Sequence, residues 1–339
     1  MKSPLLYDVT LRDGSNANNQ CFSSEFYNSY IDQAYAAGIR HIEVGHGYGL
    51  GGSSLHIGPL KDKGIWDVVA SKARQYPELQ IGVHLIPGLA TFEDIDFCIE
   101  HGMSIFRVAS HCTEADTTET YIQYVESRSF EAWGLLMMCH MAEPQKLVEQ
   151  ASKLVSYGAR RVVFLDSAGA LTPAAVQEIS EQLVTTLDRP VGFHAHNNLN
   201  AAVANSLAAL AAGCQSIDAS AGGYGPGAGN LSLESLVAIL EKDGQTTGPD
   251  VLKLMELAAA MENAYGSSMP KCNSISTATG FHGLFSGFKP KILEAAANYG
   301  VNPFELIEAL GKQQVIAGQE DQIIATAQLM STPNISCVP

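Results

Sequence analysis

The amino-acid sequence predicts an α/β protein, built as a closed (β/α)8 TIM barrel and followed by a C-terminal helical domain. Short apolar runs alternate with longer helical patterns through the first two-thirds of the chain. Eight such units within roughly 240 residues suit a closed barrel better than an open sheet. After residue 248 the strand-like runs stop and only helical patterns remain.

The eight expected strands are short and consist mainly of apolar and β-branched residues. They lie at 5–11, 41–45, 80–85, 104–109, 132–138, 161–166, 190–196 and 216–220. The helical patterns between them include 24–38, 93–102, 143–158, 174–187 and 201–213. Most of these helical patterns end in glycine, a common residue just past a helix C-terminus. No Gly-x-Gly-x-x-Gly segment follows the first strand, which disfavours a dinucleotide-binding fold.

The sequence predicts two domains, a catalytic barrel at 1–248 and a helical domain at 249–339. The expected helices of the second domain are 250–265, 291–299, 303–310 and 320–330. The segment 272–288 is rich in Ser, Thr and Gly, so we expect a loop there that covers the mouth of the barrel.

Composition excludes several classes of protein. A hydrophobic fraction of 46% indicates a globular chain with a large core. The net charge of -15 argues against nucleic-acid binding through phosphate neutralisation. The seven cysteines form no CxxC pair, so neither a disulfide framework nor a zinc ribbon is expected. We find no secretion signal and no run of about 18 apolar residues, and therefore expect a cytoplasmic protein that does not bind membranes.

Residues with metal-binding chemistry end the first and seventh strands. In a barrel, functional side chains lie at the carboxyl ends of the strands. Asp13 follows strand one, and the run 193–196 contains His194 and His196, which share one face because strand side chains alternate. One carboxylate and two imidazoles suit a divalent metal with open positions for substrate. A lone histidine is more often a core residue, but this combination predicts a metal site.

A glycine-rich segment, 222–230, follows strand eight. Glycine lets the backbone approach a ligand closely, so we expect this loop to face a ligand, with Asn230 supporting the metal site. At the end of strand two, Glu43 and His46 are candidate catalytic groups. The alternative for both is a hydrogen-bonded barrel rim.

Eight segments of the chain resemble the 4-hydroxy-2-oxovalerate aldolases, and the resemblance runs over nearly the whole length. They are 8–15, 42–47, 111–116, 136–138, 166–167, 194–196, 222–230 and 318–321. The strand-one and strand-seven motifs are shared with a wider superfamily that includes HMG-CoA lyase and isopropylmalate synthase. The segments around Glu114 and Gln319 are more specific to the hydroxy-oxo-acid aldolases.

The resemblance implies cleavage of a 4-hydroxy-2-oxo acid to pyruvate and an aldehyde through a metal-bound enolate. It implies a divalent metal, usually Mn²⁺ with Co²⁺, Mg²⁺ or Zn²⁺ as alternatives, held by Asp13, His194 and His196. Arg12 would stabilise the enolate, and Ser167 would contact the substrate carboxylate. It also implies an acylating aldehyde dehydrogenase as partner, and we expect an oligomer.

Three positions depart from the family pattern. Asn16 stands where the family has a histidine, Phe285 where it has a tyrosine, and Asn197 where it has a third histidine after the strand-seven pair. We expect Asn16 and Phe285 to line the substrate site still. An amide cannot act as a general base, however, and a phenyl ring cannot exchange a proton.

The identity of the base therefore stays open among Glu43, His46, His282 and a hydroxide on the metal. Two other functions also stay open. One is a Claisen-type enzyme that joins an acyl-CoA to a 2-oxo acid, since such enzymes share the metal motif. The other is a metal-binding family member without turnover, because two acid–base groups are replaced.

Overall fold

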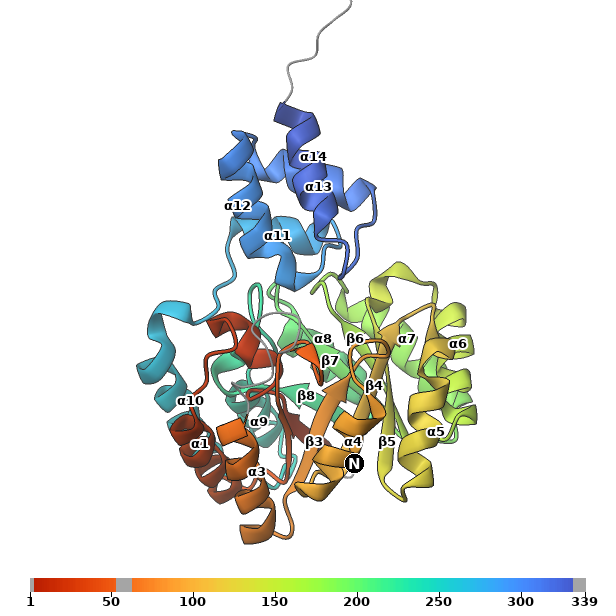
Figure 1. The fold of residues 1–339 in the computed structure, drawn as a ribbon, viewed down its shortest axis with the longest axis vertical. Helices are drawn as coiled ribbons and strands as arrows, with labels where there is room; N and C mark the ends of the chain where they lie inside the picture. The colour runs from red at the N-terminus through yellow and green to blue at the C-terminus, as the bar shows by residue number, and fades with distance from the viewer. Residues whose placement is uncertain (1–2, 53–62, 332–339) are drawn as a thin grey trace, which may run out of the picture.

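The computed structural model describes residues 3–52 and 63–331, and it confirms the barrel. Eight parallel strands close into a cylinder in the order β1 to β8, with helices around the outside (Figure 1). The strands are β1 Leu5–Asp8, β2 His41–Val44, β3 Gln80–Leu85, β4 Ile105–His111, β5 Glu131–Met137, β6 Arg161–Asp166, β7 Val191–Ala195 and β8 Ser216–Ala219.

The first strand is shorter than expected because the side chain of Asp8 turns the chain. Its Oδ1 accepts hydrogen bonds from the Thr10 backbone N–H (2.9 Å) and hydroxyl (2.6 Å). The Val9 carbonyl then accepts the Asp13 N–H at 2.9 Å, and a 3₁₀ helix begins at Asp13. Asp13 therefore lies on a turn above β1 rather than within the strand.

The helices around the barrel bury one face each, as their sequence period requires. In α6, for example, Leu147, Ala151 and Leu154 are fully buried. These helices are α1 Ser24–Ala36, α3 Lys63–Gln75, α4 Phe92–Glu100, α5 Glu119–Ser127, α6 Pro144–Ser156, α7 Pro173–Thr186, α8 Ala202–Ala211, α9 Leu233–Lys242 and α10 Val251–Tyr265. Short 3₁₀ turns lie at Asp13–Asn18, Ala115–Thr118, Cys139–Met141, Ala221–Gly223, Gly266–Ser268 and Ser286–Phe288.

Helix α10 belongs to the barrel, although the expected division at 248/249 assigns it to the second domain. Its Leu254, Leu257 and Met261 are buried in the same core as the barrel helices. Figure 1 shows α10 beside α1 and α9 on the left flank of the barrel. Helix α10 therefore packs with the barrel helices.

The C-terminal domain comprises α11 Ser274–Phe281, α12 Lys289–Tyr299, α13 Pro303–Lys312 and α14 Asp321–Ser331, and it sits over one end of the barrel (Figure 1). It has its own core, which includes Leu284, Phe288 and Ile292. No helix in the described part of the chain is long and apolar enough to cross a membrane.

The expectation of a loop throughout 272–288 is wrong, because α11 lies within it. The Asn273 side chain caps this helix by accepting the Ser276 N–H at 3.0 Å. Ile275 and Ala278 pack against the helical core, and that packing overrides the weak helix propensity of Ser, Thr and Gly. The segment that follows α11 does reach the barrel, where Ser286 bonds to the end of β6.

Candidate active site

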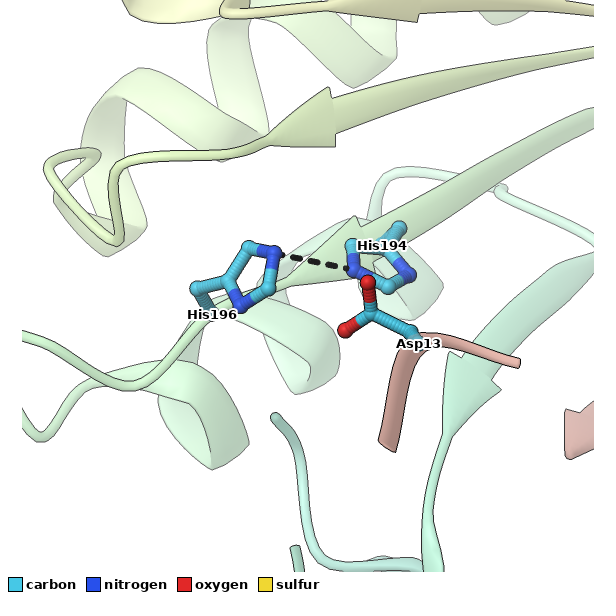
Figure 2. Close-up of side chains that lie close together, drawn as sticks. All are labelled: Asp13, His194 and His196. Carbon is cyan, nitrogen blue, oxygen red and sulfur yellow. Dashed lines mark hydrogen bonds between the residues drawn. The ribbon is translucent and has the colours of Figure 1, made fainter. Parts of the chain in front are cut away.

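Asp13, His194 and His196 converge at the carboxyl ends of β1 and β7 (Figure 2). One candidate ligand atom from each lies within 4.8 Å of the others, and all three residues are buried. The Nε2 atoms of the two imidazoles are 3.4 Å apart. The structure thus brings together the three residues that the strand-end pattern groups.

The histidines of this trio are arranged as metal ligands would be. His194 Nδ1 lies 3.0 Å from Asp218 Oδ2, and a proton donated there leaves the Nε2 lone pair facing the trio. His196 Nδ1 has no hydrogen-bond partner among the described residues. Burial lowers the pKa of His196 to about 4, so its imidazole is neutral. Two imidazole nitrogens beside a carboxylate fit a divalent cation.

Asp13 is held as an anion by its neighbours. Arg12 Nη1 donates to Oδ1 at 2.7 Å, and Asn230 Nδ2 donates to Oδ2 at 2.9 Å. Burial alone would raise the pKa of Asp13, but Arg12, the two histidines and Asn230 together hold it well below its usual range. A metal would therefore meet a carboxylate that is already ionised.

The glycine-rich loop positions Asn230 beside Asp13. Gly229 has φ +91°, and a Cβ there would lie 2.3 Å from the Gly223 carbonyl, so only glycine fits the turn. Directly after this turn, Asn230 pairs with His196 as an isolated bridge. The expected support of the metal site by Asn230 takes the form of its hydrogen bond to Asp13.

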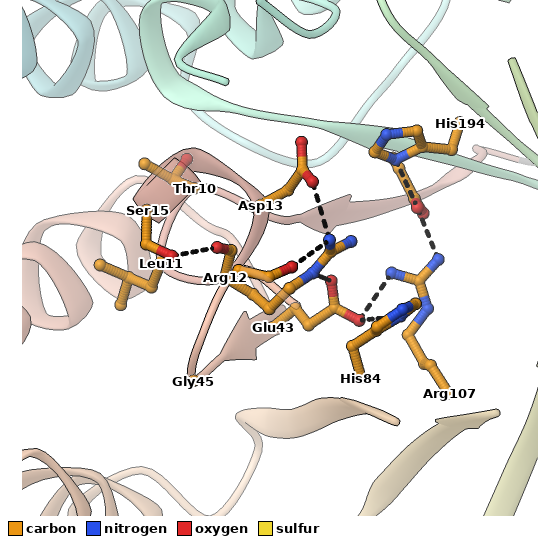
Figure 3. A network of polar contacts seen from close by, with 12 residues as sticks. Thr10, Leu11, Arg12, Asp13, Ser15, Glu43, Gly45, His84, Arg107 and His194 are labelled. Atoms are coloured by element: carbon orange, nitrogen blue, oxygen red, sulfur yellow. Dashed lines mark hydrogen bonds and ion pairs between the residues drawn. The ribbon is translucent and has the colours of Figure 1, made fainter. Parts of the chain in front are cut away.

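Arg12 lies at the start of a buried network of charges (Figure 3). Its Nε donates to Glu43 Oε2 at 2.6 Å, and its Nη1 also reaches the Gly47 carbonyl at 3.3 Å. The second oxygen of Glu43 accepts from Arg107 Nη1 at 3.0 Å. The opposite end of the Arg107 guanidinium donates to Asp218 Oδ2 at 2.5 Å.

Among the alternatives expected for Glu43, its contacts favour a hydrogen-bonded supporting carboxylate over a base. Burial would raise the pKa of Glu43, but Arg107 and Arg12 hold it at about 2. Its side chain is 0% exposed and is not part of the cavity wall. Glu43 is therefore a buried carboxylate partner of two guanidinium groups.

His46 and His282 also lie outside the main cavity. His46 Nδ1 accepts the Tyr48 N–H at 3.2 Å, and the two rings stack. The ring of His46 lines a separate space of about 20 Å³ beside Trp66. His282 follows the end of α11. The geometry gives neither histidine access to a substrate bound at the trio.

The main cavity, of about 290 Å³, opens above the trio. Among the residues expected to bind substrate, Arg12, Asn16, Ser167 and Phe285 all line it. Asn16 lies 3.5 Å from Asp13 and accepts a hydrogen bond from Gln20. Ser167 Oγ accepts the Met138 N–H at 3.0 Å, which leaves its hydroxyl proton for a ligand.

Sequence reasoning missed several polar groups of the cavity wall. His84 lies near the carboxyl end of β3, and Ser110 and His111 lie at the carboxyl end of β4. The rule that functional side chains lie at strand ends therefore applied to them too. Each of the histidines stands alone in the sequence, however, and an isolated histidine carries little signal. Tyr48 and Glu114 complete this polar side of the wall.

The C-terminal domain forms the roof of the cavity with Phe285, Ile316 and Ala317. This roof is anchored next to Phe285, where Ser286 donates to the Ser167 carbonyl from both its N–H (3.0 Å) and its hydroxyl (2.9 Å). The cavity is therefore shared between two units, with polar groups on the barrel and an apolar cover above.

Two protein families match this chain. The sequence profile of the HMGL-like family matches residues 3–261, and that of the DmpG-like communication domain matches residues 270–332. The first match ends within α10, which is consistent with the packing of that helix against the barrel.

Curated relatives match over almost the full chain. A 4-hydroxy-2-oxovalerate aldolase from Burkholderia pseudomallei is 44% identical over 96% of this chain and 94% of its own length. An enzyme of the same name from Pectobacterium atrosepticum is 41% identical over 99% of this chain and 98% of its own.

Solved structures share the fold at low sequence identity. The carboxyl transferase domain of Rhizobium etli pyruvate carboxylase, solved with pyruvate and biocytin, superposes with a TM-score of 0.82 at 18% identity, covering 97% of this chain and 60% of that one. The HMG-CoA lyase of Bacillus subtilis gives a TM-score of 0.69 at 20% identity, covering 82% and 97%.

Proposed function

The chain belongs to the HMGL-like family and, within it, to the 4-hydroxy-2-oxovalerate aldolases, and from this membership we propose that it cleaves a 4-hydroxy-2-oxo acid to pyruvate and an aldehyde. The observation that carries the proposal is the convergence of Asp13, His194 and His196 with Arg12 on one cavity. A carbon–carbon lyase of this kind needs a way to stabilise negative charge on the 2-oxo acid, and these residues supply it.

Asp13, His194 and His196 would hold a divalent metal, for which we propose Mn²⁺. When bound, such an ion acts as a Lewis acid on the oxygens of a 2-oxo acid. Arg12 extends the positive potential over the same part of the cavity, because its guanidinium is fixed by Glu43 and Gly47. Ser167 would donate its hydroxyl proton to the substrate carboxylate.

The reaction breaks the C3–C4 bond of the substrate. A base takes the proton of the 4-hydroxyl, the C–O bond becomes the carbonyl of the aldehyde, and the electron pair of the broken bond passes to C3 as an enolate. Arg12 stabilises the charge that develops there. A proton delivered to C3 then yields pyruvate.

The hydroxyl proton would pass to the β4 side of the wall, where His111 and Glu114 lie. Neither Asn16 nor Phe285 can accept it. His84 is a poor acceptor, because burial and the nearby Arg12 guanidinium lower its pKa to about 3. We propose His111 as the base, since it ends β4 and its Nε2 has no hydrogen-bond partner among the described residues.

The match of residues 270–332 supports an acylating aldehyde dehydrogenase as the partner that receives the aldehyde. The outer surface of this domain carries exposed apolar side chains, with Phe281 76% and Leu329 75% exposed. Aromatic side chains such as that of Phe281 are enriched at protein–protein interfaces. We further propose a cytoplasmic enzyme that works as an oligomer.

The test combines a chelator with two substrate panels. Activity should disappear when the metal is removed and return when Mn²⁺ is added. A panel of 4-hydroxy-2-oxo acids should release pyruvate, measured by reduction with lactate dehydrogenase. Acyl-CoA with 2-oxo acids should give no condensation. Condensation in place of pyruvate release, or full activity in excess chelator, would refute the proposal.

A further inference from the structure

Arg12 and His194 are joined by a continuous chain of buried ion pairs and one hydrogen bond beneath the cavity (Figure 3). The chain runs from Arg12 to Glu43 (2.6 Å), from Glu43 to Arg107 (3.0 Å), from Arg107 to Asp218 (2.5 Å) and from Asp218 to His194 (3.0 Å). Its two ends are the charge-stabilising guanidinium and a candidate metal ligand. Every link lies inside the barrel, away from solvent.

Arg107 is the middle of this chain and touches neither the cavity nor the trio. Its side chain is 0% exposed and is not part of the cavity wall. It projects from β4 into the barrel interior, where its guanidinium stacks on Tyr7 at 4.4 Å and lies 5.5 Å from the Trp133 ring centre. A direct role in chemistry is therefore excluded by its position.

The geometry of the guanidinium links its two carboxylate partners. Nη1 donates to Glu43 and Nη2 to Asp218, and the planar fork holds these two nitrogens at a fixed separation and angle. The aromatic rings restrict the plane of the fork. A shift of Arg107 would therefore displace both carboxylates together.

Burying these charged side chains costs free energy, so the fixed geometry that they provide explains the arrangement better than a gain in stability does. Removing charges from water is expensive, and an apolar replacement of similar volume often gives equal or greater stability. A buried chain of this kind does offer fixed geometry, since Glu43, Arg107 and Asp218 each have a partner on either side. Stability alone does not call for charges here.

We propose that Arg107 is a positioning residue that sets the spacing between Arg12 and His194, and so between the charge-stabilising group and the metal ligands. The part that concerns Arg12 rests on the proposed function, while the part that concerns His194 rests only on metal binding. Glu43 transmits the position of Arg107 to Arg12, and Asp218 transmits it to His194.

The test measures Mn²⁺ affinity, kcat, KM and the free energy of unfolding in R107K. Lysine keeps the positive charge and loses the fork. We expect Mn²⁺ affinity to fall 10- to 100-fold, the range typical of groups that orient metal ligands, and kcat to fall at least tenfold with KM changed less. A folded R107K protein with wild-type Mn²⁺ affinity and kcat overturns the proposal.

Arg161 offers a matched control. Its guanidinium lies 4.8 Å from the Trp133 ring centre in the same interior, yet it has no ionic contact with Glu43 or Asp218. R161K should leave Mn²⁺ affinity and kcat within about threefold of wild type. Equal losses in R161K and R107K would make the effect one of barrel integrity and overturn the proposal.

Two further variants keep the proposal testable should R107K fail to fold. D218N should lower Mn²⁺ affinity more than kcat, and E43Q should lower kcat more than Mn²⁺ affinity, because each breaks one arm. Identical losses of both quantities in the two variants overturn the proposal. Mn²⁺ affinity can be measured without substrate, so this part of the test gives a result even if aldolase activity is absent.

Discussion

Asn230 Nδ2 donates a hydrogen bond of 2.9 Å to Asp13 Oδ2, across a separation of 217 residues in the sequence. The same amide donates to the Tyr224 carbonyl at 3.2 Å, so the glycine-rich loop fixes its orientation. The carboxylate of Asp13 is thereby aimed by a residue that is not itself one of the three candidate ligands. Metal affinity should therefore depend on the loop.

Removing this amide should weaken the metal site without abolishing it. In N230A we expect Mn²⁺ affinity, measured by calorimetry, to fall 10- to 100-fold, as for other groups that orient ligands. D13N should abolish binding. N197A is the control, because Asn197 bonds to Asn200 and Ala202 instead, and its affinity should stay within about threefold. Unchanged affinity in N230A would contradict the assignment.

Arg12 should matter for the rate more than for the metal. In R12K the forked contacts to Glu43 and Asp13 are lost while one positive charge remains. We expect kcat to fall about 10²- to 10³-fold, the usual effect of losing a donor to developing charge, and Mn²⁺ affinity to change less than tenfold. If kcat and Mn²⁺ affinity fall equally, the main role of Arg12 is to orient the metal ligands and not to stabilise developing charge.

Metal binding should resist acid. Because burial lowers the pKa of His196 to about 4, protons compete for this ligand only well below its ordinary value of 6.5. We expect Mn²⁺ affinity to stay level from pH 8 to about 5. In the metal-free protein the unfolded state binds this proton first, so the free energy of unfolding should decrease as the pH falls from about 6.5 to about 4. Affinity already halved near pH 6.5 would argue against His196.

His111 and His46 should respond differently to substitution. H111Q should lower kcat about 10²- to 10⁴-fold, because it removes the proposed base, and Mn²⁺ affinity should be unchanged. H46Q should stay within about threefold, since His46 lies in a separate space beside Trp66. If kcat is unchanged in H111Q and reduced in E114Q, the base is Glu114 and not His111.

Restoring the family's acid–base groups should raise the rate with 4-hydroxy-2-oxovalerate. Asn16 and Phe285 both face the cavity, so the histidine and tyrosine found at these positions in the resembling family would reach the same space. We expect kcat of N16H/F285Y to rise at least tenfold, and that of the matched N16Q/F285L to remain low. An unchanged kcat in N16H/F285Y would contradict the expectation that groups at these two positions act on the substrate.

The barrel and the metal trio could be predicted because both depend on local patterns. Alternation within 193–196 places His194 and His196 on one face, and the strand-end rule adds Asp13 from β1, which only β8 separates from β7 in the closed barrel. Helix α11 could not be predicted, since its stability comes from Ile275 and Ala278 packing on a core assembled from later residues.

The charged chain beneath the cavity was also beyond sequence reasoning. Arg107 and Asp218 are 111 residues apart, and no local pattern connects them. From sequence alone, a buried arginine on a strand cannot be told from an exposed one, because its charged partners are not known. Glu43 was noticed as a carboxylate at a strand end, but its partners turn it from a candidate base into a fixed anion.

Ser167 connects the barrel to the helical domain. Its hydroxyl faces the cavity, while its backbone carbonyl accepts hydrogen bonds from Ser286 of the helical domain. The chemistry is confined to strand ends, whereas the surface above it comes from a separately folded cap. Substitutions at Ile316 and Ala317 would therefore reshape the surface above the substrate while the groups at the strand ends stay the same.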